Sequence, residues 1–387
     1  MTKFAVRFLT CLLQVSSASA SERAISITMD DLPVAPGSVR SLEEAQEITR
    51  NILSTFQEYR VPAIGFVNEN RLEVDGVVDP ARVALLEQWL QAGLELGNHG
   101  YAHLDLHRVD VATWEQDIVK GARVLDPLLA RHGKTPRFFR HPFLHTGKSV
   151  AIRDRTSAFM KDHGYRVAPV TIDNQEWMFG FAYAQASTDA DKKRIAEAYL
   201  RYMKSVVEFY EEQARAIVGE EIPQILLVHA YALNGDSLGE LLGWLRGRDY
   251  RFIPLEEALQ HPAYASEDQY TGPAGITWLH RWAITRNMPK SIFAGEPEAP
   301  DWIKHDDRSI SKPLAALDRR LSRRHPFHPN RAFPGFRSGR SFGQSRLGHS
   351  RWSNRELQPV GSNLGKPRLL CDDAIILAGW PHSRSTR

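Results

Sequence analysis

Acidic residues and histidines that could bind a metal ion or transfer a proton recur along the chain. Asp30 and Asp31 are adjacent, and His99 and His103 are four residues apart. On a helical turn this spacing places both imidazoles on one side, where they could bind one Zn²⁺. Hydrolytic zinc sites commonly combine two histidines with one carboxylate. We therefore expect Asp31 as third ligand, with His107 as the alternative, and Asp30 as a general base.

Short apolar segments alternate with helix-period segments between Ala24 and Leu259. The predicted strands are Ala24–Met29, Val61–Val67, Leu94–Asn98, Arg137–Arg140, Tyr165–Ile172, Gln224–His229 and Arg251–Pro254. The predicted helices are Leu42–Tyr59, Ala81–Ala92, Thr113–His132, Ser149–His163, Asp189–Val218 and Ser237–Arg246. Such alternation is typical of a parallel sheet, and seven repeats within about 250 residues favour a (β/α) barrel of the α/β class.

Polar residues follow the predicted strands repeatedly. Barrel enzymes place their catalytic residues at the carboxyl ends of the strands, so five such groups in order indicate an active site. An arginine beside a carboxylate base would keep it ionised and oriented, and Arg140 is the candidate. The groups are Asp30-Asp31, Asn98 to His103, Arg140 to Phe143, Asp173 to Trp177, and His229.

In this order the groups resemble the motifs of the NodB-like polysaccharide deacetylases, carbohydrate esterase family 4. The resemblance implies a distorted (β/α) barrel of about seven parallel strands and a divalent metal, with Zn²⁺ preferred. It also implies removal of N-acetyl groups from an N-acetylated polysaccharide, which releases acetate and a free amino sugar. The matching motifs are Thr28-Met29-Asp30-Asp31, His99-x-x-x-His103, Arg140-x-Pro142-Phe143, Asp173-x-x-Glu176-Trp177 and Leu227-Val228-His229.

The resemblance also implies a role for each matching residue. Asp31, His99 and His103 are the expected metal ligands, Asp30 the general base and His229 the general acid. The other matching residues are expected to tune or shape the site: Arg140 supports Asp30, Glu176 with Asp173 tunes His229, the N–H of Phe143 stabilises the oxyanion, and Trp177 and Leu227 form a pocket for the acetyl methyl group.

Four positions depart from the usual motifs. Leu32 stands where the family has glycine, Gly100 where it has serine or threonine, Phe143 where tyrosine is frequent, and Glu176 where it has aspartate. These departures remove no expected ligand and no acid or base. They indicate a divergent subgroup, in which the substrate differs more than the chemistry.

Four further residues invite a functional interpretation that we do not favour. His141 and His145 lie near the expected site, but histidines in loops are more often solvated than catalytic. Trp278 and Trp282 are four residues apart and could stack on sugar rings. Aromatic residues at this spacing more often pack in a core, so we expect them to be buried against the barrel.

The first twenty residues resemble a secretory signal. Lys3 and Arg7 precede a mostly apolar segment, Phe8–Val15, and Ala18-Ser19-Ala20 matches a cleavage site. We expect a secreted or periplasmic protein with no transmembrane segment, because no stretch approaches the roughly 20 apolar residues needed to span a bilayer. Cleavage would leave one cysteine, Cys371, and no intrachain disulfide.

The charge of the chain is divided unevenly. Residues 308–387 hold 16 basic and 4 acidic residues, a balance of +12, whereas the rest has a balance of −9. Rich in Arg, Ser, Gly and Pro, this tail cannot bury enough apolar surface to fold, so we expect a disordered tail after a deacetylase domain at 21–307. It could contact anionic polymers weakly; a solvated extension or a shifted reading frame is the alternative.

Three other functions fit parts of the sequence. The barrel and metal could hydrolyse another non-peptide amide, although a secretion signal favours a polymer substrate. A non-catalytic carbohydrate-binding protein would not need the full set of Asp30, His99, His103 and His229. Binding of nucleic acid by the basic tail ranks last, because the tail carries no aromatic motif or fold motif of a nucleic-acid-binding module.

Overall fold

The structure is a computed structural model that describes residues 23–39 and 41–304. The expected signal segment 1–20 and basic tail 308–387, with Cys11 and Cys371, lie outside the described residues. The expectations for them, including the domain boundary at 307, stay predictions. Among the described residues, none of the helices has the length and apolar character that crossing a bilayer demands.

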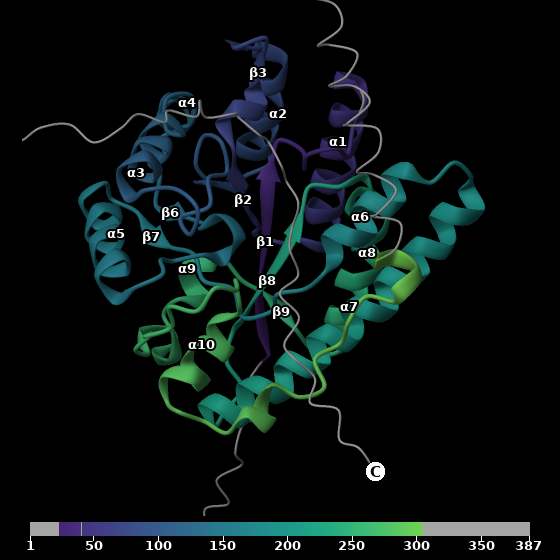
Figure 1. The fold of residues 1–387 in the computed structure, drawn as a ribbon. Coiled ribbons are helices and arrows are strands. Elements are labelled where there is room, and N and C mark those ends of the chain that lie inside the picture. The colour runs from purple at the N-terminus through teal and green to yellow at the C-terminus, as the bar shows by residue number, and fades with distance from the viewer. Residues whose placement is uncertain (1–22, 40, 305–387) are drawn as a thin grey trace, which may run out of the picture. The chain divides into compact units, whose positions relative to one another are not determined.

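A seven-stranded sheet lies at the centre of the described fold, and its strands pair in parallel (Figure 1). The strand order is β7–β6–β5–β2–β1–β8, and β9 pairs with β1. Beyond β7, Ile172 forms a parallel bridge to Leu226 of β8, so the curled sheet begins to return on itself. The expected distorted barrel of about seven parallel strands is confirmed. The strands are β1 (Ala24–Leu32), β2 (Ile64–Val67), β5 (Glu95–Asn98), β6 (Phe138–Phe139), β7 (Arg166–Val167), β8 (Gln224–His229) and β9 (Arg251–Phe252).

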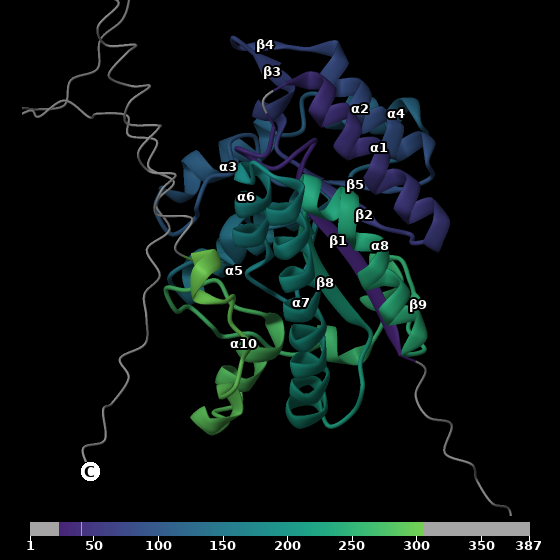
Figure 2. The same ribbon diagram turned by 90° about the vertical axis from the view of Figure 1, so that its right-hand side faces the viewer.

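Helices flank the sheet, as the alternation predicts. Helix α1 packs on α8, and α6, α7 and α8 pack against one another; Figure 2 shows this helical layer from the side. The helices are α1 (Leu42–Tyr59), α2 (Pro80–Gln91), α3 (Val111–Lys120), α4 (Leu125–Arg131), α5 (Val150–Asp162), α6 (Glu176–Gln185), α7 (Asp189–Val218), α8 (Ala232–Gly247), α9 (Leu255–Ala258) and α10 (Trp278–Thr285). Shorter elements are the hairpin β3 (Glu73–Val74) and β4 (Val77–Val78) and the 3-10 turns η1 (Glu69–Leu72), η2 (Pro142–Leu144), η3 (Pro262–Ala265) and η4 (Lys290–Phe293).

The predicted single helix from Thr113 to His132 is wrong, because the chain forms α3 and α4 instead. At Gly121 the backbone packs so closely on the loop after β5 that a Cβ would lie 2.7 Å from the carbonyl carbon of Gly100. Helix α6 and the β3–β4 hairpin also escaped prediction. Helix α6 is apolar around most of its circumference, so it has no helical period to detect.

The core surrounds β1, whose nine residues are all buried. A strand covered on both faces should be apolar throughout, yet just before its last residue, Leu32, β1 has two aspartates, which burial would ordinarily exclude. The segment beyond the barrel also contributes to the core: Trp278 and Trp282 are buried, as expected. The carboxyl end of β1 is therefore a place where the fold retains charged groups inside the protein.

Candidate active site

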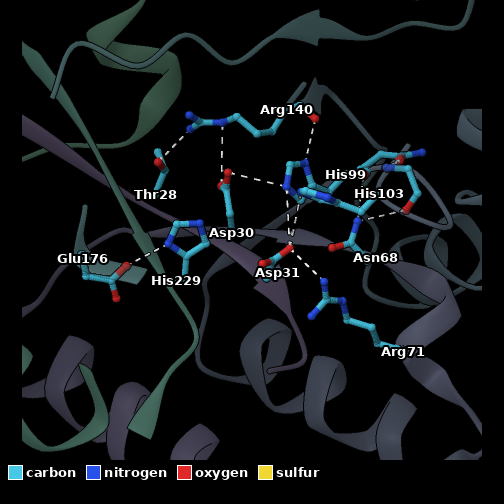
Figure 3. A network of polar contacts seen from close by, with 12 residues as sticks. Thr28, Asp30, Asp31, Asn68, Arg71, His99, His103, Arg140, Glu176 and His229 are labelled. Carbon is cyan, nitrogen blue, oxygen red and sulfur yellow. Dashed lines mark hydrogen bonds and ion pairs between the residues drawn. The ribbon is translucent and has the colours of Figure 1, made fainter. Parts of the chain in front are cut away.

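Asp30 and Asp31 converge on the same histidine, although neighbouring residues of a regular strand face opposite sides. The Nε2 atom of His99 lies 3.7 Å from Oδ2 of Asp30 and 3.9 Å from Oδ1 of Asp31 (Figure 3). The backbone explains this convergence: Asp31 has a φ of 70°, and the register with β2 shifts between Met29 and Leu32. The distorted strand end therefore directs both carboxylates into one site.

Asp31, His99 and His103 form a group that fits a metal ion, and we call these three residues the metal-type group. Their ligand atoms all lie within 4.8 Å of one another, and Nε2 of His103 is 3.8 Å from Oδ1 of Asp31. The Nδ1 atom of His99 is 2.8 Å from the carbonyl oxygen of Arg140, which leaves Nε2 toward the carboxylates. The two imidazole planes are inclined by 77°, so each ring can direct an in-plane lone pair at a shared ion. One carboxylate and two imidazoles form a donor set suited to Zn²⁺.

Two residues that the sequence analysis missed hold this group in place. Arg71 donates from Nη2 to Oδ1 of Asp31 at 3.2 Å, and Asn68 donates from Nδ2 to the carbonyl oxygen of His99 at 2.7 Å. Burial alone would raise the pKa of Asp31, but the charges of Arg71 and His103 hold it well below its ordinary value. Arg71 and Asn68 both lie in the segment that follows β2, and none of the sequence motifs includes them.

Arg140 lies beside Asp30, as the resemblance implies. Its side chain is fully buried, its Nε is 3.8 Å from Oδ1 of Asp30, and its Nη2 donates to Oγ1 of Thr28 at 2.7 Å. Neither Arg140 Nε nor Asp30 Oδ1 makes a hydrogen bond within the described part of the chain. Burial raises the pKa of Asp30 to about 6, although the positive charge of Arg140 opposes the rise.

His229 approaches the same site from β8 and is paired with Glu176. The Nδ1 atom of His229 lies 2.8 Å from Oε2 of Glu176, the first residue of α6. Asn234 donates to the other oxygen of Glu176 at 2.5 Å and to the carbonyl oxygen of His229 at 2.8 Å. Burial would lower the pKa of His229, but Glu176, together with the charges of Asp31 and Asp30, raises the pKa to about 9. Asn234 is a further residue that sequence reasoning missed.

Asp173, Trp177 and Leu227 are neighbours of this pair, and in the described part of the chain their side chains make no hydrogen bond to His229 or Glu176. Oδ1 of Asp173 accepts from the N–H of Asn174 at 2.9 Å, and desolvation raises the pKa of Asp173 to about 7 although the side chain keeps partial exposure. Leu227 is buried in β8, and Trp177 is partly buried against Phe181. Asp173 is therefore expected to act on His229 through its charge and not through a hydrogen bond.

Phe143 contacts the metal-type group through the ring of His103. Its ring centroid is 4.6 Å from that of His103, and the side chain is 40% exposed. Phe143 has a φ of 57°, so its backbone is in the left-handed region and forms a turn instead of continuing the helix. The expected ligands, acid, base and their charged partners thus lie around one centre, at the carboxyl ends of β1, β5, β6 and β8 and at the start of α6 (Figure 3).

Two of the departures from the motifs have a structural reason. Gly100 has a φ of 80°, and a Cβ there would lie 2.6 Å from Oδ2 of Asp117. The carboxylate of Asp117 accepts from the N–H groups of Tyr101 and Ala102 at 3.0 Å each, so it steadies the loop that a hydroxyl would otherwise steady. The extra methylene of Glu176 still permits its hydrogen bond to His229.

His107 belongs to a separate cluster with Asp105 and His145, not to the group at Asp31. The ligand atoms of this cluster also lie within 4.8 Å of one another, and Nδ1 of His145 is 2.7 Å from Oδ1 of Asp105. However, the rings of His107 and His145 stack 3.9 Å apart at 4°. Parallel rings cannot both direct in-plane lone pairs at one ion, so this cluster suits a metal less well. His141 is not solvated either; it is buried and stacks on Trp114.

The fold and the site define a parallel barrel with a carboxylate and histidine centre. Residues 17–168 match the model of the polysaccharide deacetylase family. This match includes the first three motifs, from Asp30 to Phe143, and confirms the resemblance inferred from the motifs. It supports a deacetylase-type hydrolase in general terms. A comparison with curated protein sequences finds no match.

Several solved structures are similar to this chain. A family 4 pseudoenzyme from Bacillus anthracis is 17% identical with a TM-score of 0.41, covering 62% of this chain and 66% of its own. A peptidoglycan deacetylase from Bacillus subtilis is 21% identical with a TM-score of 0.40, covering 62% and 93%. A family 4 carbohydrate esterase from Streptomyces lividans, in complex with acetate, is 18% identical with a TM-score of 0.39, covering 61% and 95%.

Proposed function

We propose that the protein removes N-acetyl groups from an N-acetylated polysaccharide in a metal-dependent hydrolysis. The observation that carries the proposal is geometric: the group Asp31, His99 and His103 lies beside two titratable residues that each have a charged partner, Asp30 beside Arg140 and His229 beside Glu176. The pKa of Asp30 is about 6 and that of His229 is about 9. At neutral pH the first is largely ionised and the second largely protonated. A pair of titratable groups with separated pKa values is the usual arrangement for a general base and a general acid.

Asp31, His99 and His103 would hold the divalent metal, with Zn²⁺ preferred for one carboxylate and two imidazoles. When bound, it would supply Lewis acidity, which lowers the pKa of water and polarises a carbonyl group. Arg71 holds Asp31 ionised, and the carbonyl oxygen of Arg140 orients His99. Such outer partners commonly determine the orientation of metal ligands.

Hydrolysis of the amide needs a base that removes a proton from the attacking water and an acid that supplies a proton to the leaving amine. Asp30 accepts the proton of the attacking water, and Arg140 keeps Asp30 in the ionised form required for this step. The N–H of Phe143 donates to the oxyanion that develops on the acetyl carbonyl. His229 then donates its proton to the leaving amine, while Glu176 stabilises the imidazolium. Acetate and a free amino sugar are the products.

We further propose that the protein acts outside the cytoplasm, in the periplasm or the medium. The proposal is supported by Lys3, Arg7, the apolar segment after them and Ala18-Ser19-Ala20. A polymeric substrate of the cell exterior agrees with this location. Fractionation of cells that express the full chain, followed by sequencing of the mature N-terminus near Ala20, tests this expectation.

Acetate release tests the proposed reaction. The full chain is incubated with a panel of N-acetylated glycans, including chitin-type oligomers, peptidoglycan and an exopolysaccharide, with and without a chelator. Release that stops with the chelator and returns with Zn²⁺ supports the proposal. Binding of a glycan with no acetate release at any metal concentration would instead identify a carbohydrate-binding protein, and release only from small non-sugar amides would identify a different hydrolase.

A further inference from the structure

The turn that carries Phe143 has an unfavourable backbone. Phe143 and Leu144 are consecutive non-glycine residues with φ values of 57° and 55°. The left-handed region is sterically disfavoured for residues with a Cβ, and two in succession persist only when the surroundings hold them. The turn itself contributes two hydrogen bonds, from the N–H of Leu144 to His141 and from the N–H of His145 to Pro142.

Arg281 of α10 contacts this turn from outside. Its Nη1 donates to the carbonyl oxygen of Leu144 at 3.3 Å, and its Nη2 donates to Oγ1 of Thr146. Arg281 is 1% exposed. A buried guanidinium is costly unless it is paired, and here Nε and Nη2 contact Oδ2 of Asp268 at 2.8 and 2.7 Å. The ring of Trp278 lies 4.6 Å from the guanidinium carbon.

The same segment also touches the turn through its backbone. A Cβ at Gly275 would lie 1.8 Å from the carbonyl oxygen of Phe143 and 2.9 Å from its carbonyl carbon. Only glycine permits this approach, so the chain between Asp268 and Arg281 packs directly on the peptide unit of Phe143. This segment lies after the five motifs and after residues 17–168.

We propose that Arg281, held by Asp268, is a positioning residue that maintains the left-handed turn at Phe143 and Leu144. This inference rests on the proposed function, in which the N–H of Phe143 donates to the oxyanion. Arg281 contacts the turn on the carbonyl side, so the N–H remains available for the substrate. Loss of this contact lets the two strained residues relax and moves the N–H away from its place in the site.

The first test measures kcat and KM for acetate release by the full chain carrying Arg281→Met, which keeps the length but removes the forked donors. Removing an oxyanion donor typically lowers kcat about 10²- to 10³-fold, and we expect a loss of about tenfold to a hundredfold, because the N–H is displaced rather than deleted. KM and metal content should stay near the wild-type values. Arg286→Met is the matched control: Arg286 caps the same helix but binds Ile217 and Ser266 instead.

Asp268→Asn is the second variant if Arg281→Met does not fold. It keeps the guanidinium and weakens its anchor, so a smaller loss of kcat is expected. An unchanged kcat in folded Arg281→Met would overturn the proposal. A loss of metal, or a change confined to KM, would also overturn it, because Arg281 would then act on His103 or on substrate binding rather than on the Phe143 turn.

Hydrogen–deuterium exchange of residues 141–147 supplies a readout that does not depend on turnover. Exchange in this segment should be faster in Arg281→Met than in the wild type and unchanged in Arg286→Met. If the wild type released no acetate from any glycan, the proposed function would fail, and this exchange measurement would still decide whether Arg281 holds the turn. Equal exchange in all three proteins would overturn the positioning role.

Discussion

Asp30 and His229 are register partners on adjacent parallel strands, β1 and β8. Their Cα atoms are paired at the last residue of β8, so the two side chains enter the site from neighbouring positions although 199 residues separate them in the chain. Glu176 contacts His229 and Arg140 accompanies Asp30. The barrel thus places a candidate acid and a candidate base side by side, each with its own charged partner.

The first prediction decides which of the two histidine-containing clusters binds the metal. His103→Ala should lose most of its bound metal, because loss of a direct ligand should exceed the 10- to 100-fold effect typical of outer partners. His107→Ala is the matched control and should keep its metal, since His107 lies in the other cluster. Elemental analysis of both purified variants measures the effect. If His107→Ala lost its metal and His103→Ala kept it, the metal would instead be bound by Asp105, His107 and His145.

The acid and base prediction concerns kcat. Asp30→Asn and His229→Ala should each lower kcat by about 10²- to 10⁴-fold, the usual contribution of a general acid or base. Metal content and circular dichroism should stay unchanged, since neither residue is an expected ligand. His132→Ala, at the end of α4, serves as the control histidine. Near-normal turnover in Asp30→Asn would mean that another residue is the base.

The pH prediction follows from the pKa of His229, which is about 9. The acid must be protonated, so kcat should fall as the pH rises past about 9. Glu176→Gln removes the carboxylate that raises this pKa, while burial still lowers it, and the alkaline limb should move to lower pH. A kcat profile from pH 6 to 10 measures the shift, with Glu212→Gln on exposed α7 surface as control. An unmoved limb would exclude His229 as the titrating acid.

A stability prediction concerns Glu69, a buried carboxyl group at the start of η1. Its Oε1 accepts from the N–H groups of Val124 and Leu125 at the start of α4, and burial raises its pKa to about 7. The unfolded value is about 4.3, so the folded state binds more protons between these pH values. The free energy of unfolding should therefore fall as the pH rises from about 4 to 7. Urea unfolding measured across this pH range should show that the free energy of unfolding falls less steeply with pH in Glu69→Gln than in the wild type. Equal slopes in the two proteins would contradict the assignment of this pH dependence to Glu69.

The fold was predictable to the extent that it depends on local periodicity. Apolar strands alternate with amphipathic helices, and this pattern indicated the parallel barrel and the polar strand ends. It failed at Gly121, where close backbone packing divides a predicted helix into α3 and α4. It also failed at α6, whose burial on most sides removes the period. Both failures occur where tertiary contacts rather than local pattern decide the conformation.

The sequence by itself determined the types and order of the groups that could do chemistry: Asp30, Asp31, His99, His103 and His229 are recognisable from spacing and position after strands. Only the tertiary structure decided how they meet and what accompanies them. The positive φ at Asp31 turns both carboxylates inward, and isolated residues such as Arg71, Asn234 and Arg281 reach the site from remote segments. Partners that lie outside the motifs have no sequence signature, because each contacts whatever group the fold brings near, and only the packed chain specifies that neighbour.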